Sequence, residues 1–127
     1  MKLFTITETD IPGVYEVQYH VSPSIQVREL AIKQLLETIE QKAYNGLIVI
    51  FGPFVPQMSI TQIFEFVEKE LAVNRLRIKP SAYVIDNSNN AISFMQDALI
   101  NRGKNTAVFD KREEAFRWLR KIIALNK

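Results

Sequence analysis

The sequence predicts an α/β fold, with one domain over residues 1–127. We expect a mixed, mostly parallel sheet of about five strands, with an N-terminal β-hairpin and four helices. Two alternating segments at the start of the chain predict the hairpin. After them, apolar strand-like segments alternate with segments of helical periodicity, as in parallel strands joined by right-handed crossover helices. The length of 127 residues suits a single domain.

The hairpin is predicted by residues 3–7 and 14–21, which alternate apolar and polar side chains on either side of Asp-Ile-Pro-Gly. Alternation predicts a half-buried second strand toward a sheet edge. His20 then lies on the polar face, where we interpret it as a solvated histidine rather than a functional one. The expected buried face holds Tyr15, Val17, Tyr19 and Val21, and the expected polar face holds Glu16, Gln18 and His20.

The first helix is predicted over residues 27–43, because apolar residues recur there at helical spacing. Asn45-Gly46 is predicted to end this helix, because glycine accepts the left-handed conformation without a Cβ clash. The recurring apolar positions are Leu30, Leu35, Ile39 and Ala43.

The rest of the chain predicts three strands and three helices in alternation. Residues 47–51 are apolar on both faces, as a central strand covered by helices must be. Residues 81–86 predict another buried strand, and 106–110 a short one. The remaining helices are predicted over 59–73, 89–103 and 111–125.

Composition excludes several classes of protein. The chain has no cysteine and one histidine, His20, which excludes disulfides, cysteine zinc sites and a multi-histidine metal site within one chain. The net charge of +2 comes from scattered basic residues, whereas a nucleic-acid-binding protein favours a dense basic stripe. The N-terminus does not read as a signal peptide, and no apolar run approaches the roughly 18 residues of a transmembrane helix. We therefore expect a cytoplasmic protein with no cofactor, no nucleic-acid partner and no membrane insertion.

Two aspartates follow predicted strands and are candidates for catalysis. Open α/β sheets bind ligands at the carboxyl ends of their strands, where Asp86 and Asp110 could hold a cation or exchange protons. Asp110 and Glu113 also form a capping box, and Asp86 begins an ordinary polar turn. We interpret both aspartates as structural, and an enzyme using them is a remote alternative.

The segment that follows the predicted central strand is the main candidate site. A run rich in apolar residues and proline leaves the strand and leads to Ser59, where the second helix is predicted to begin. Exposed apolar loops often mark a protein partner, a subunit interface or an apolar ligand. The predicted partner or ligand surface is Phe51, Gly52, Pro53, Phe54, Val55, Pro56 and Met58.

Ser59 itself has two interpretations. Ser59 and Gln62 form a capping box, in which the serine hydroxyl accepts a backbone N–H. A helix N-terminus also favours anions, so Ser59 is a possible regulatory phosphosite.

The favoured function is a non-enzymatic protein-interaction module acting through residues 52–59 and the start of the second helix. The first alternative is a pocket for a small apolar or lipid-like ligand, lined by Phe51, Phe54, Met58 and Phe94. A homodimer is also possible, because the apolar loop and the Tyr15/Tyr19 strand could form an interface.

The order of elements resembles the STAS domain of bacterial anti-sigma-factor antagonists, in its SpoIIAA-like branch, which is also similar to the SEC14 lipid-binding group. Residues 80–86 look like the late central strand, and 105–119 like the closing strand and helix. By spacing, Ser59 falls at the serine that a partner kinase phosphorylates in that family. Met58 and Ile50 stand where many antagonists carry aspartates. The resemblance thus implies the fold and a binding or regulatory module rather than the kinase-switched mechanism.

Overall fold

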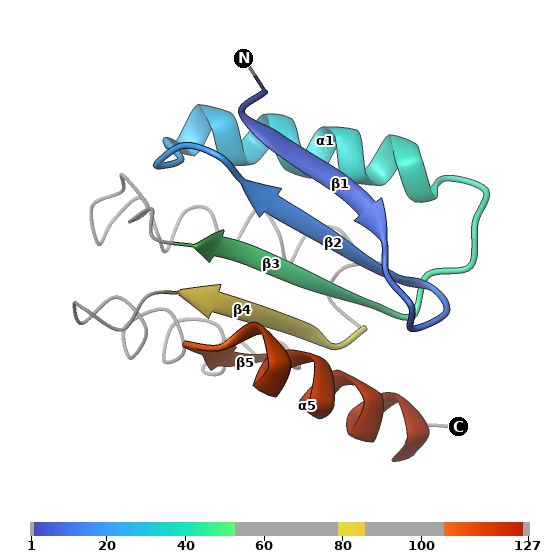
Figure 1. Ribbon diagram of the computed structural model, residues 1–127. Coiled ribbons are helices and arrows are strands. Elements are labelled where there is room, and N and C mark those ends of the chain that lie inside the picture. Colours follow the sequence, from blue (N-terminus) through green and yellow to red (C-terminus); the bar gives the residue numbers. More distant parts are fainter. Residues whose placement is uncertain (1, 53–78, 86–105, 126–127) are drawn as a thin grey trace.

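The computed structural model describes residues 2–52, 79–85 and 106–125 (Figure 1). Within these ranges the chain forms an α/β fold, in which a five-stranded sheet carries one helix on each face. The predicted helices over 59–73 and 89–103 lie outside the described residues. The described elements are β1 (Phe4–Glu8), β2 (Val14–Tyr19), α1 (Ile25–Ile39), β3 (Gly46–Gly52), β4 (Ser81–Ile85), β5 (Thr106–Phe109) and α5 (Arg112–Leu125).

The strand order in the sheet is β1-β2-β3-β4-β5, the same as in the sequence. β1 and β2 pair antiparallel, while β2 to β5 pair parallel with their neighbours. The predicted hairpin and mostly parallel sheet are therefore confirmed. β2 is the second strand from the edge, and β1 is the edge strand.

The helix α1 is shorter than predicted, and its boundary was assigned to the wrong residues. It ends at Ile39 rather than near Ala43. Two of the four apolar positions expected on its inner face lie on the surface instead: Ala43 is exposed, and Leu30 is 41% exposed. Gly46 does not end the helix either, because it begins β3. Asn45 instead binds the hairpin turn: its amide Nδ2 donates to the Pro12 carbonyl at 2.9 Å, and its backbone N–H donates to the Gly13 carbonyl at 2.7 Å.

The face of the sheet beneath α1 is rich in aromatic side chains. Leu35 and Ile39 of α1 are fully buried against it, as expected from their helical spacing. Ser24 caps the start of this helix by accepting the Val27 N–H at 3.3 Å. The sheet residues in this layer are Tyr15, Val17, Tyr19, Leu47, Val49, Phe51, Tyr83 and Ile85.

The opposite face is mostly aliphatic and packs against α5. Ala115, Phe116 and Leu119 are the buried residues of this helix. They face Val14, Ile48, Ile50, Ala82 and Val84 of the sheet. β3 and β4 are thus buried on both faces, which is why they read as continuous apolar runs.

Candidate functional site

The parallel strands all end on the same side of the sheet, where the sequence predicts the site. We call this side the carboxyl edge; it runs across the strand ends and is distinct from the outer strand β1. In Figure 1 the arrowheads of β2, β3 and β4 lie on the same side. β3 ends at Gly52 and β4 at Ile85. Most of the predicted site residues follow these ends and lie outside the described residues, namely Pro53, Phe54, Val55, Pro56, Met58, Ser59, Asp86 and Phe94.

β3 carries a bulge where it reaches this edge. Its register with β4 pairs Ile50 with Val84, but the next pair joins Gly52 to Ile85. Two steps along β3 therefore match one step along β4. A bulge bends its strand and changes the direction of the chain, and bulges are frequent beside functional sites. It lies immediately before the apolar segment predicted to carry the function.

Phe51 lies in the core rather than on the surface. Its exposed fraction is 0%. Its ring stacks on that of Tyr19, with centroids 5.3 Å apart, and lies 6.5 Å from that of Tyr83. In this structure Phe51 therefore packs within the aromatic layer beneath α1 rather than lying on the surface.

Arg28 is a buried charge at the same place, and the sequence analysis missed it. It lies in the first turns of α1, is 3% exposed, and places its guanidinium carbon 5.4 Å from the centre of the Phe51 ring. The sequence did indicate that Arg28 could be buried, because it lies at helical spacing from Ala31, Leu35 and Ile39. A buried arginine is uncommon unless its charge is compensated.

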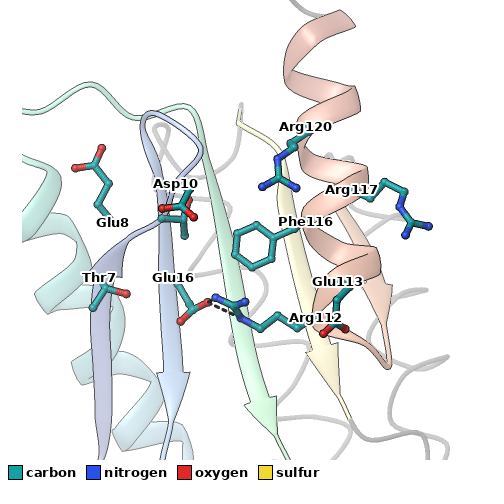
Figure 2. A pocket seen from close by; sticks show the side chains of 10 residues that line it. Thr7, Glu8, Asp10, Glu16, Arg112, Glu113, Phe116, Arg117 and Arg120 are labelled. Atoms are coloured by element: carbon teal, nitrogen blue, oxygen red, sulfur yellow. Dashed lines mark hydrogen bonds and ion pairs between the residues drawn. The ribbon is translucent and has the colours of Figure 1, made fainter.

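A second candidate site lies between the hairpin and α5. We call it the polar groove; its volume is about 520 Å³, and Figure 2 shows the hairpin on one side and α5 on the other. α5 contacts β3, β4 and β5, so the hairpin's polar face lies beside the helix. The groove is lined by Thr7, Glu8, Thr9, Asp10, Glu16, Arg112, Glu113, Phe116, Arg117 and Arg120.

An arginine–glutamate pair crosses the polar groove. Arg112 donates to Glu16 Oε1 from Nη2 at 2.7 Å and from Nε at 3.0 Å. The guanidinium carbons of Arg112 and Arg120 lie 4.4 and 5.9 Å from the Phe116 ring centre (Figure 2). The pair joins α5 to the hairpin. Because carboxylates and arginines both line the groove, it suits a polar partner that carries groups of both charges rather than a simple anion.

The remaining polar residues of the described part form local contacts. The exposed His20 lies 2.7 Å from the Thr5 hydroxyl through its Nε2. Asp110 is exposed and lies two residues before the first residue of α5. Among the described residues, no group of three or more His, Cys, Asp or Glu side chains could hold a metal ion.

Comparison with known proteins gave no match: no family model, no curated protein and no solved structure matches the chain. No helix in the described ranges is both long enough and apolar enough to span a bilayer.

Proposed function

We propose that the chain is a non-enzymatic, cytoplasmic protein-binding module of the STAS type, acting through residues 52–59 at the carboxyl edge of its sheet. The proposal includes the two further helices predicted over 59–73 and 89–103. Its partner is another protein, or a second copy of the chain, and not a nucleic acid.

The observation that supports the proposal most strongly is the bulge at the end of β3, above a buried aromatic layer. Phe51 is fixed between Tyr19 and Tyr83 and beneath Arg28. The chain then leaves the bulge at Gly52 and continues into Pro53, an apolar stretch and a second proline. The two prolines restrict the backbone of this apolar segment, which limits the entropy that binding would cost.

Ser59 is the residue through which such binding would be regulated. Phosphorylation would add close to two negative charges beside the apolar segment. Its capping role alone predicts that Ser59→Ala lowers stability by about 1 kcal/mol and leaves binding unchanged.

The test is affinity purification of three tagged forms from the protein's own cells. Phe54→Asp places a charge within the proposed surface. Leu125→Asp is the matched control, because Leu125 is a large apolar residue that is 70% exposed on α5. We expect a co-purifying protein that is lost with Phe54→Asp and kept with Leu125→Asp, while both variants melt at the wild-type temperature. The same set of bound proteins in all three samples would contradict the proposal.

A further inference from the structure

We propose that the polar groove binds a short peptide with free termini, two or three residues long, whose ammonium group faces the hairpin and whose carboxylate faces α5. This inference goes beyond the proposed function and uses none of the residues 52–59 on which that function rests. The groove holds about 520 Å³, which is within the range of sites that bind small molecules. A volume of this size suits two or three residues better than a single amino acid.

The two walls of the groove carry opposite charge. Among the residues that line it, the hairpin contributes three carboxylates and no basic side chain, and α5 contributes three arginines and one carboxylate (Figure 2). A ligand with a single charge would be attracted to one wall and repelled by the other. A zwitterion matches both walls when its ammonium group lies at the hairpin and its carboxylate at α5.

Two of these charges lie on opposite walls of the groove without pairing. Figure 2 shows the Arg120 guanidinium extending from α5 toward the hairpin, where Asp10 lies. In the described part of the chain neither side chain has an ion-pair partner, whereas Arg112 and Glu16 satisfy each other. Both Arg120 and Asp10 are exposed, so a ligand reaches them without breaking an ion pair. We therefore assign Arg120 to the peptide carboxylate and Asp10 to the ammonium group.

The space between these two charges suits the peptide link. The Phe116 ring lies there beside the Arg120 guanidinium (Figure 2). Thr7 is exposed on β1 and lines the same groove, and its hydroxyl both donates and accepts hydrogen bonds. A peptide bond carries one N–H donor and one carbonyl acceptor, so the hydroxyl matches either group. This match is the reason to assign the groove to a peptide rather than to a zwitterion that lacks an amide.

The first test titrates trialanine into the whole chain and follows the backbone amide signals by NMR. Trialanine has two free termini and no charged side chain, so its binding depends on the termini and the peptide links. Its N-acetyl form lacks the ammonium group, and its C-terminal amide lacks the carboxylate. We expect trialanine to shift signals of the hairpin and α5. Each blocked form should bind roughly tenfold more weakly, because it loses a hydrogen bond between charged groups.

The second test identifies the residue that recognises each end, with matched control variants. Arg120→Gln removes a positive charge from the groove, and Lys121→Gln removes the neighbouring exposed charge of α5, which does not line the groove. Asp10→Asn and Glu114→Gln form the equivalent acidic pair. We expect Arg120→Gln to abolish the preference for trialanine over its amide, and Asp10→Asn to abolish the preference over the N-acetyl form. The two control variants should keep both preferences.

Each preference compares two ligands on one protein. A variant that only disturbs the structure lowers both affinities and leaves their ratio unchanged. The proposal would be overturned if trialanine did not bind, if the blocked forms bound equally well, or if Arg120→Gln kept its preference for the free carboxylate. None of these results depends on Phe54, so the polar groove and the proposed protein-binding surface are tested separately.

Discussion

The two faces of the sheet are covered in different ways. Beneath α1 the sheet offers stacked rings, and even the hairpin contributes, because Phe4 and Ile6 pack against that core. On the other face α5 lies over β3, β4 and β5, and the hairpin there carries Thr7 and Glu16 beside the polar groove. The hairpin thus has one face in the core and one face at a groove, whereas β3 and β4 are buried on both.

The two faces therefore differ in role: the α1 face stabilises the fold, and the α5 face carries a candidate binding groove. The α1 layer contains most of the large, fully buried side chains, and burial of apolar area is the main stabilising contribution. The polar groove has little such burial, and the ion pair that joins α5 to β2 across it is partly exposed to solvent. Changes in the α1 layer should therefore lower stability strongly, whereas changes at the polar side chains of the groove should lower it little.

The largest expected effect comes from truncating one leucine in each layer. Leu35 and Leu119 are both fully buried, in the α1 and α5 layers respectively. We expect Leu35→Ala to lower the free energy of unfolding by about 3–5 kcal/mol, and Leu119→Ala by about 2–3 kcal/mol. The reason is that the stacked rings around Leu35 cannot move to fill a cavity as readily as the mostly aliphatic side chains around Leu119 can. Urea unfolding measures both, and an equal or reversed order would remove the contrast between the layers.

A smaller effect is expected at the hairpin turn, which both faces share. Gly13 has a φ of 75°, and a Cβ there would clash with Asn45 Nδ2. We expect Gly13→Ala to destabilise the protein by about 1–2 kcal/mol, because an L-residue is strained at positive φ. Adding Asn45→Ala would relieve the contact but not the strain. Thermal melting measures the stability of both variants. Full recovery of wild-type stability in the double variant would show that the backbone conformation at residue 13 does not cause the loss.

The smallest effect is expected at the Arg112–Glu16 pair. Their side chains are 54% and 12% exposed, and exposed ion pairs contribute about 0–1 kcal/mol. Glu16→Gln should therefore lower stability by less than about 1 kcal/mol, and the difference from wild type should shrink as salt is added. A loss comparable to Leu119→Ala would mean that the polar groove contributes to the core.

Much of the fold could be predicted because strands and hairpin follow from local patterns. The alternation in β2 gave its buried face, and the continuous apolar run of β3 gave a strand covered on both sides. The end of α1 could not be predicted in this way. Asn45-Gly46 reads as a helix stop, but a contact with Pro12, 33 residues away in sequence, determines what Asn45 does.

The candidate site was harder to predict because it depends on contacts between distant segments. The bulge in β3 exists only through its pairing with β4. Arg28 is buried because α1 lays it on Phe51, and a charged residue in a helical pattern is ordinarily taken as exposed. The polar groove brings Glu16 and Arg112 together across 96 residues of sequence.

Native mass spectrometry of the protein purified from its own cells, before and after denaturation, tests the proposed function most directly. We expect a second polypeptide held non-covalently, and a phosphate-sized increment at Ser59 that survives denaturation would identify how its binding is regulated. An unmodified chain with no bound protein, or one carrying only a small molecule lost on denaturation, would contradict the protein-binding function.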